Sequence, residues 1–289
     1  MNKKLLNSIP TYEDILSASG RLKDLAVKTP LLEAPLFNKL LGVRVLLKAE
    51  TLQLTGSFKF RGAFNAISIK NEQARLKGVV AYSSGNHAQG VAHAAAILDL
   101  PAVVVMPEDA PKLKINNTLA FGAKVIKYNR FLENREDIGE ALSTEKKFEL
   151  IKPYDDPLII AGQGTIGAEI LSQCNEKKAQ LNAVYVPCGG GGLTAGIATA
   201  IKHNLPSVKI FAVEPDGFDD TSKSIACGKR VRNLPNKKSI CDALLAEIPG
   251  KITFFINSKI LSGAVSVSDK DTLSAMKNAF KYFKLSIEP

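Results

Sequence analysis

The sequence predicts an α/β protein with two domains, each built on a mostly parallel, twisted sheet flanked by helices. Three observations predict this class. Short apolar runs typical of buried strands alternate with longer runs suited to helices, first over residues 78–147 and again over residues 165–213. A polar, proline-containing segment, residues 152–157, separates the two runs. The length of 289 residues suits two domains or one large α/β unit.

The first element expected is a helix that begins after Thr11. The Thr11 side chain can accept from N–H groups of the first turn, and Asp14 can reach back, as in a capping box. Apolar residues that include Leu22 and Leu25 would form its buried face. The helix would end before Pro30, because the residue preceding proline avoids the helical region.

A lysine stands between the next two expected elements. Residues 43–49 form an apolar run typical of a buried strand, and residues 63–70 favour a helix. Lys59 would therefore lie near a helix N-terminus, where the positive end of the dipole and burial both disfavour the ammonium form. A lysine held neutral in a pocket is a nucleophilic amine that forms Schiff bases with carbonyls. On this stretch alone, a solvated surface lysine is the competing interpretation.

The remaining elements follow the alternating pattern, which favours a mostly parallel sheet covered by helices. In the first half, strands are expected at residues 79–82, 102–106 and 124–128, and helices ending near residue 98 and spanning 111–121 and 133–147. In the second half, we expect helices at 165–174 and 193–203 and strands at 183–186, 209–213, 252–256 and 264–267. A last helix, capped by Ser268 and Asp271, would run to residue 283, before a short strand at 285–287.

Composition excludes several classes of protein. Hydrophobic residues make up 45% and charged residues 23%, and no apolar run approaches membrane-spanning length. Residues 1–10 make no convincing signal peptide, and the four cysteines show no CxxC spacing, so a cytoplasmic location is expected. Three histidines make a zinc site unlikely. The net charge of +10 makes a nucleic-acid partner worth considering. However, the lysines are scattered and no aromatic stripe lies between them, so we expect the charge to reflect a solvated, lysine-rich surface.

Four consecutive glycines, residues 189–192, lie between an expected strand and an expected helix. Glycines allow backbone N–H groups to converge on a phosphate, and the helix N-terminus adds positive potential. Gly190, Gly192 and Ala195 also fit the loose dinucleotide pattern, with Glu214 near the position of a ribose-binding acid. A nicotinamide cofactor is therefore a competing interpretation, whereas the pattern of an ATP or GTP P-loop is absent.

A polar turn, residues 83–87, follows the strand at 79–82. Ser84 and His87 suggest a serine hydrolase, but the G-x-S-x-G elbow is missing. Small hydrogen-bonding residues at the C-terminal end of a strand are well placed to hold a small ligand. The alternative is a plain helix cap.

Together these stretches closely resemble the fold-type II pyridoxal-phosphate enzymes, those of the tryptophan-synthase β-subunit fold, and in particular the serine/threonine dehydratase and serine racemase branch. The agreement follows family order from about residue 29 to residue 289. The matching segments are LQLTGSFKFRGA at 52–63, SSGNHAQG at 83–90, MP at 106–107, AGQGT at 161–165, GGGG at 189–192 and VEP at 213–215. The resemblance leaves the nicotinamide interpretation without a task for Lys59.

The resemblance implies pyridoxal 5'-phosphate in a cleft between a large domain, residues 1–70 and 155–289, and a small mobile domain, residues 71–154. Lys59 would bind the cofactor covalently, and Ser84 would stand on the opposite ring face as an acid/base. The other implied cofactor contacts are Phe58 beside the ring, Asn86 on the ring hydroxyl, Gly189, Gly190, Gly191 and Gly192 on the phosphate, and Ala243, where relatives often carry glycine.

The resemblance also implies substrate and metal contacts. Ser83, Ser84, Asn86 and His87 would bind the substrate amino acid, chiefly its carboxylate. Arg135 is either a ligand of a second substrate carboxylate or a surface arginine. Glu214, Asp220 and the carbonyl of Phe218 fall where this branch binds a divalent cation, for which oxygen ligands favour Mg²⁺ or Ca²⁺, and a solvated turn is the alternative.

The expected function is β-elimination from a 3-hydroxy amino acid (threonine, serine or 3-hydroxyaspartate) by a homodimer, giving a 2-oxo acid and ammonia. Serine racemisation, which uses the same Lys59 and Ser84, stays open. The sequence stops at Pro289, where relatives continue with a helix and a strand that carries a serine or threonine for the pyridine nitrogen. A shortened, inactive cofactor-binding or interaction protein is therefore the alternative of another class.

Overall fold

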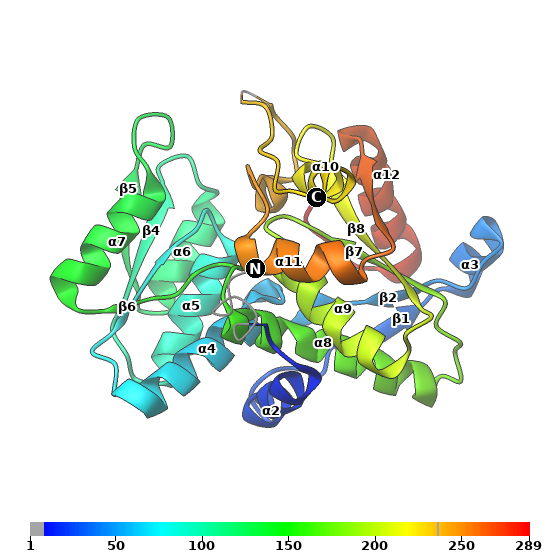
Figure 1. Cartoon of the computed structure of the whole chain (residues 1–289), viewed down its shortest axis with the longest axis horizontal. Helices are drawn as coiled ribbons and strands as arrows, with labels where there is room; N and C mark the ends of the chain where they lie inside the picture. The colour runs from blue at the N-terminus through cyan, green and yellow to red at the C-terminus, as the bar shows by residue number, and fades with distance from the viewer. Residues whose placement is uncertain (1–8, 236) are drawn as a thin grey trace.

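Two parallel sheets lie side by side, each with helices packed around it (Figure 1). The computed structural model describes residues 9–235 and 237–289. Residues 1–8, which include most of the stretch judged above for a signal peptide, lie outside the described residues. The predicted α/β class with two mostly parallel sheets is confirmed.

The first sheet has the strand order β5-β4-β3-β6, with every pair parallel. Every residue of β3 and β4 is buried, because helices cover both faces. The connecting helices carry the chain from the end of one strand to the start of the next. The elements are β3 (Val79–Tyr82), α5 (Asn86–Ile97), β4 (Ala102–Pro107), α6 (Lys112–Ala120), β5 (Lys124–Tyr128), α7 (Arg135–Lys146) and β6 (Glu149–Leu150).

The second sheet has the strand order β7-β8-β9, again parallel. Its core contains Ile197, Ile201 and Ile210, which are nearly or fully inaccessible to solvent. The elements are β7 (Ala183–Pro187), α9 (Gly192–Asn204), β8 (Lys209–Pro215), α10 (Asp220–Cys227), α11 (Lys251–Ile260) and β9 (Gly263–Val267).

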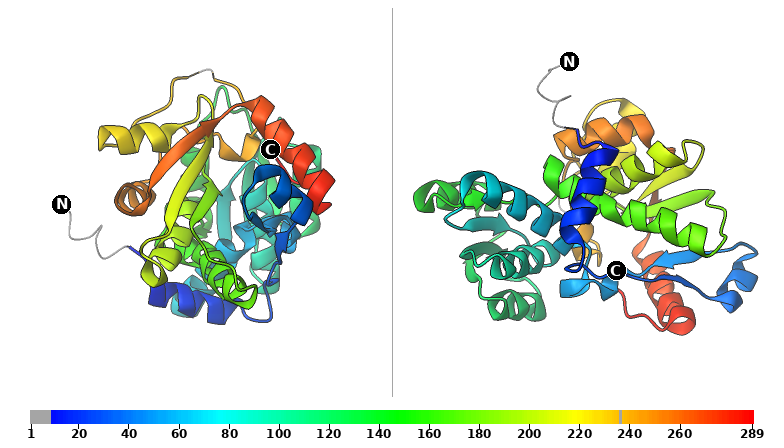
Figure 2. Two further views of the ribbon diagram at one scale, coloured as in Figure 1. Left: turned by 90° about the vertical axis from the view of Figure 1, so that its right-hand side faces the viewer. Right: turned by 90° about the horizontal axis from the view of Figure 1, so that it is seen from below.

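Two long helices, α4 (Lys59–Ala74) and α8 (Pro157–Glu176), join the two halves. They pack at glycines: a Cβ added to Gly162 would lie 2.7 Å from the Cα of Gly62, so only glycine permits this approach. The N-terminal helix α2 (Tyr12–Leu22) packs against α8, as the view from below shows (Figure 2). No helix in the described part of the chain is long and apolar enough to cross a membrane.

The other elements lie around this frame. An antiparallel pair, β1 and β2, carries α3 at its turn, and α12 continues into a π-helical turn. Their bounds are β1 (Leu31–Glu33), α3 (Pro35–Leu41), β2 (Leu46–Lys48), α12 (Asp269–Asn278) and the π-turn η4 (Ala279–Phe283), with 3₁₀ turns η1 (Glu50–Leu52), η2 (Leu54–Gly56) and η3 (Asp242–Leu244).

Three expectations about elements were wrong. The first helix has its predicted capping box but ends at Leu22, and Asp24 takes a left-handed backbone conformation that leaves Leu25 37% exposed. Residues 252–256 lie in helix α11 rather than in a strand. No strand covers residues 285–287 among the described residues.

Candidate active site

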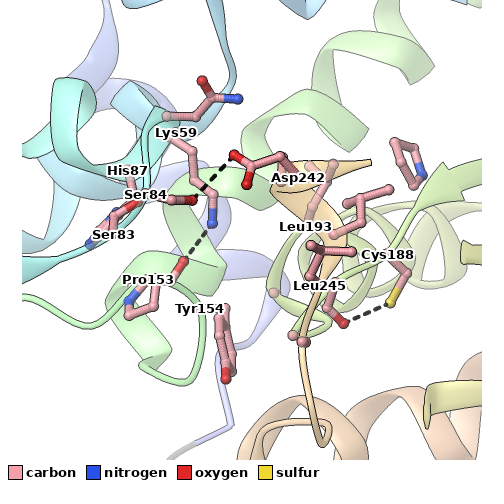
Figure 3. A pocket seen from close by; sticks show the side chains of 18 of the residues that line it. Lys59, Ser83, Ser84, His87, Pro153, Tyr154, Cys188, Leu193, Asp242 and Leu245 are labelled. Carbon is pink, nitrogen blue, oxygen red and sulfur yellow. Dashed lines mark hydrogen bonds between the residues drawn. The ribbon is translucent and has the colours of Figure 1, made fainter. Parts of the chain in front are cut away.

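A cavity opens at the C-terminal ends of β3 and β7, between the two halves of the chain (Figure 3). This is the position where parallel α/β sheets bind ligands, because the helix N-termini and loops meet there. The cavity brings together all the cofactor and substrate residues expected from the sequence. They are Phe58, Lys59, Ser83, Ser84, Asn86, His87, Arg135, Gly189, Gly190, Gly191, Gly192 and Ala243.

Lys59 is the first residue of α4, and its side chain points into the cavity. Its Nζ donates to the carbonyl oxygen of Pro153 at 2.8 Å, and 5.2 Å separates it from the ring centroid of Phe58. A carbonyl partner does not neutralise the ammonium charge, so desolvation dominates and lowers the pKa of Lys59 to about 8. An appreciable fraction of the amine is therefore neutral near physiological pH, as a nucleophile requires.

The glycine loop presents its bare backbone to the cavity. The carbonyl of Gly190 accepts from Thr253 Oγ1 at 2.7 Å, and the carbonyl of Gly191 accepts from the amide nitrogen of Asn257. With the carbonyls held by α11, the N–H groups of residues 189–192 donate to no residue in the described ranges. The loop also leads into α9, where the buried Thr194 Oγ1 has no partner among these residues. Such a cradle suits a phosphate.

The turn between β3 and α5 presents a helix start without a side-chain cap. The N–H groups of Asn86 and His87 donate to no residue in the part of the chain that the structure describes, so they are available to a carboxylate. Buried His87 is bonded through Nε2 to the carbonyl of Ile151 at 3.0 Å. Burial lowers its pKa to about 3, so the ring is neutral. Because Nε2 must carry the proton toward that carbonyl, Nδ1 is an acceptor, and only the backbone of His87 is suited to bind a carboxylate.

Ser84 lies in the same turn and lines the cavity. Its Oγ donates to Oδ2 of Asp242 across the cleft, at 3.4 Å (Figure 3). Asp242 begins η3, which also carries Ala243. A hydroxyl held by a carboxylate has a defined orientation, with its lone pairs turned away from the acid.

Arg135 is the first residue of α7, and its guanidinium lies 5.7 Å from the ring centroid of Tyr82. No carboxylate of the described residues lies within salt-bridge distance of this guanidinium. In contrast, Arg130 pairs with Asp109 at 2.8 Å. The cavity therefore contains a guanidinium without a salt-bridge partner among residues 9–235 and 237–289, which is a suitable setting for an anionic group of a ligand.

The expected metal ligands lie outside this cavity. Glu214 accepts from the N–H groups of Thr221 and Ser222 at 2.8 and 2.9 Å, and Asp220 accepts from Asn233 at 2.8 Å. Burial raises the pKa of Glu214 to about 7, and burial together with the nearby Glu214 charge raises the pKa of Asp220 to about 7. The second oxygen of Asp220 is buried and has no partner in the described ranges. Carboxylate oxygens are ligands of the kind that Mg²⁺ and Ca²⁺ take, but no cluster of three metal-binding side chains occurs among the described residues.

Sequence reasoning missed four residues near the cavity. Tyr154 lies in the segment 152–157, which we interpreted only as a separator, Asp242 precedes Ala243 and was given no role, and Lys114 lies inside α6 without a local signal. Glu288 contacts both Asn86 and Lys114 although 202 residues separate it from Asn86 in the chain. Only the fold brings these groups together.

The residues present fit a pyridoxal-phosphate cofactor. The cavity combines a nucleophilic lysine, an aromatic ring beside it and a glycine cradle whose side-chain space is already filled. A Cβ on Gly190 would lie 2.4 Å from the ring of Tyr154, and one on Gly192 would lie 3.0 Å from the same residue. The cradle is therefore built for bare backbone, as a phosphate site requires.

Comparison with known proteins gives consistent results. Residues 22–289 match the family model described as pyridoxal-phosphate dependent enzyme. The L-threo-3-hydroxyaspartate ammonia-lyase of Saccharomyces cerevisiae is 44% identical over 97% of this chain and 85% of its own length. The serine racemase of Schizosaccharomyces pombe is 39% identical with the same coverage.

A solved structure agrees with this result. The crystal structure of a T.th. threonine deaminase superposes with a TM-score of 0.92 at 42% identity, covering 97% of this chain and 89% of that one. Both the match to the family model and these identities extend over nearly all of the described fold. The chain belongs to the family of pyridoxal-phosphate dependent enzymes.

Proposed function

We propose that this protein is an ammonia-lyase that removes water and then ammonia from a 3-hydroxy amino acid, and that 3-hydroxyaspartate is its preferred substrate. The observation that carries the reaction is Lys59 and Ser84 converging on one cavity beside the glycine cradle. The observation that favours a dicarboxylic substrate is Arg135, which lines the same cavity without a carboxylate partner among the described residues. Relatives named for hydroxyaspartate, threonine and serine make all three substrates candidates.

The residues have separate tasks in this proposal. Bound pyridoxal phosphate supplies an electron sink for the carbanion at the substrate Cα. Lys59 would hold the cofactor and, once released by the substrate amine, would take the α-proton, for which its lowered pKa suits it. The Ser84 hydroxyl would turn from Asp242 toward the substrate and give its proton to the departing β-hydroxyl, and the α-proton taken by Lys59 would then replace it. Hydrolysis of the released unsaturated amine then yields a 2-oxo acid and ammonia, so one water is lost and one is consumed.

The binding residues complete the site. The backbone N–H groups of Asn86 and His87, with the hydroxyl of Ser83, would hold the α-carboxylate. Residues 189–192 would hold the phosphate, Phe58 would cover the ring, and Ala243 would border it. We further propose that residues 71–154 move as a small domain against residues 1–70 and 155–289.

The substrate assignment is tested by Arg135→Gln. We expect kcat/KM for L-threo-3-hydroxyaspartate to fall about 100-fold, because a charge-assisted bidentate contact is lost, while kcat/KM for L-threonine changes less than about threefold. Oxo-acid formation is measured for both substrates. Arg130→Gln, which breaks the Arg130–Asp109 pair near the same helix, is the control. An equal loss for both substrates would contradict a carboxylate-binding role for Arg135.

Serine racemisation is the second candidate, favoured because Lys59 and Ser84 both reach the cavity. Lys59 and Ser84 would then exchange the α-proton on the two faces without loss of the hydroxyl. Chiral analysis of residual serine, run beside the oxo-acid assay, separates the two outcomes. D-Serine appearing faster than pyruvate would make racemisation the main reaction.

We also propose that Glu214, Asp220 and the carbonyl of Phe218 bind Mg²⁺ or Ca²⁺. The support is the buried Asp220 oxygen without a partner in the described ranges and the closeness of two carboxylates. Adding either ion to chelator-treated protein should raise the melting temperature, and Asp220→Asn should abolish that rise. Light scattering would test the proposed homodimer, and cell fractionation the cytoplasmic location.

A further inference from the structure

A carboxylate that does not line the cavity holds two residues that do. Oε2 of Glu288 accepts from Nδ2 of Asn86 at 2.6 Å, and Oε1 of Glu288 lies 3.0 Å from Nζ of Lys114. Asn86 begins α5, and Lys114 belongs to α6, so the two partners come from adjacent helices of the first sheet. The Lys114 side chain is 13% exposed and that of Glu288 is 45% exposed, so only the lysine end of the pair is shielded from solvent.

The chemistry of the carboxylate fixes the orientation of the amide. An ionised carboxylate only accepts hydrogen bonds, whereas an amide has a donating end and an accepting end. Glu288 therefore selects the rotamer of Asn86 that turns its NH₂ group toward the carboxylate and excludes the flipped one. One N–H of that NH₂ group is used, and the second remains for a ligand of the cavity.

Lys114 fixes the carboxylate in turn. With one oxygen held by the ammonium and the other by the amide, the Glu288 carboxylate cannot rotate without losing a contact. A charge-assisted hydrogen bond is stronger than a neutral one, so this arrangement resists the amide flip better than a neutral acceptor would.

We propose that Glu288 is a positioning residue, which with Lys114 holds the Asn86 amide so that its free N–H faces the oxygen on the cofactor ring. This inference rests on the proposed function, because it assigns Asn86 to the cofactor. The ring oxygen influences how readily the cofactor nitrogen bound to Lys59 is protonated. Loss of Glu288 therefore changes the electronic state of the bound cofactor without removing any group that touches it.

The test is the visible absorption spectrum of the holoenzyme, recorded between pH 6 and pH 10. Glu288→Gln keeps the shape of the side chain but can donate as well as accept, so the Asn86 amide is free to flip. We expect the midpoint of the spectral titration to shift by about half to one pH unit. This is the size of shift expected when the bound cofactor loses the one hydrogen bond from Asn86. Cofactor dissociation should accelerate about threefold to tenfold.

Three further variants sharpen the test. Glu288→Asp retains an acceptor-only group and should restore most of the wild-type titration. Lys114→Met frees the carboxylate and should shift the midpoint in the same direction as Glu288→Gln, by less. Glu176→Gln removes a partner from another lysine–glutamate pair, Lys28–Glu176 at 3.0 Å, and should leave the spectrum unchanged.

The possible results separate this inference from the proposed function. A wild-type protein that shows the cofactor band but makes no oxo acid counts against the proposed function and leaves the titration readable. A Glu288→Gln midpoint equal to that of wild type, or equal shifts in Glu288→Gln and Glu176→Gln, would overturn the positioning role. Melting temperatures recorded in parallel exclude unfolding as the cause of a shift.

Discussion

At the scale of single residues, the cavity changes the acid–base chemistry of the groups it buries. Burial lowers the pKa of Lys59 to about 8 and that of His87 to about 3, and raises the pKa of the Cys188 thiol to about 12. All three shifts favour the neutral form, because a low-dielectric site disfavours charge. The site therefore contains an amine, Lys59, that is partly deprotonated near neutral pH. His87 and Cys188 stay uncharged there and do not exchange protons with it.

Lys59 should show its lowered pKa in the rate of cofactor capture. When cofactor-free protein is mixed with pyridoxal phosphate, the rate of visible band formation should rise with pH and reach half its maximum near pH 8. A midpoint near the ordinary lysine value of 10.5 would contradict the effect of burial. Lys59→Ala should show no protein-bound band at any pH.

The same shift has a consequence for stability. The unfolded chain holds the Lys59 proton up to about pH 10.5, whereas the fold releases it near pH 8. Between these values the unfolded state binds more protons, so this residue makes the free energy of unfolding rise with pH across that window. Lys59→Met should reduce that rise in the cofactor-free protein, as measured by urea denaturation at pH 8 and pH 10.

Gly190 and Gly189 provide a matched pair of substitutions in the phosphate cradle. Gly190→Ala places a methyl group 2.4 Å from the partly buried ring of Tyr154, whereas the nearest atom to a Cβ on Gly189 is at 3.4 Å. We expect Gly190→Ala to cost about 1–3 kcal/mol of stability through overpacking, and Gly189→Ala less than about 1 kcal/mol. Thermal unfolding of the cofactor-free proteins compares them. Equal melting temperatures would mean that Tyr154 moves aside freely.

The cavity residues could be predicted from sequence because they lie in short, contiguous motifs. The lysine, the polar turn and the glycines each keep their chemistry within a few residues. The roles of Asp242 and Glu288 could not be predicted from the sequence, because each contacts a partner more than 150 residues away. The neutral state of His87 was equally hidden, since it depends on burial and on the Ile151 carbonyl.

At the scale of elements, helix α4 holds Lys59 in place through an ion network two residues further along. Arg61 is 1% exposed, and its guanidinium donates to both oxygens of Glu50 and to both oxygens of Glu169. Glu50 lies in η1 and Glu169 lies in α8. The Arg61 guanidinium therefore connects the start of α4 to both η1 and α8.

Removing this arginine should be costly. Arg61→Met leaves the largely buried Glu50 without its ion-pair partner, while Glu169 keeps Lys48, and we expect the free energy of unfolding to fall by about 3 kcal/mol. Lys28→Met breaks the exposed Lys28–Glu176 pair, which solvent screens, and should cost much less. Chemical denaturation of both variants provides the comparison. Similar losses would show that the network contributes no more than a surface pair.

Element boundaries were predicted well where the signal is local and poorly where it is distant. The Thr11–Asp14 capping box predicted the start of α2 correctly. Residues 252–256 are mostly apolar, which suggested a strand, yet they are helical, and Asp155 caps this helix by accepting from the N–H groups of Lys251, Ile252 and Thr253. That cap is supplied from almost 100 positions earlier, so no local pattern reveals it.

At the scale of the whole molecule, the net charge of +10 has a kinetic consequence. A positive protein attracts an anionic substrate over about a Debye length, and salt screens that attraction. Raising the ionic strength from about 20 mM to about 200 mM should lower kcat/KM for 3-hydroxyaspartate severalfold and leave that for neutral threonine nearly unchanged. Initial-rate assays at both ionic strengths test this. Parallel losses for both substrates would point to an effect on the enzyme instead of on substrate encounter.

The segment that leads from β6 into α8, residues 151–157, has contacts at nearly every position. The carbonyl of Pro153 accepts from Lys59, the ring of Tyr154 fills the space beside Gly190, Asp155 caps α11 and Asp156 caps α8. Because four of its residues make these contacts at the same time, the number of residues in the segment is constrained. An inserted or deleted residue would move all four contacts out of register, whereas the exposed loop at residues 129–134 has room to change. We therefore expect natural variants of this enzyme to differ in loop length at 129–134 while the length of the 151–157 segment stays constant.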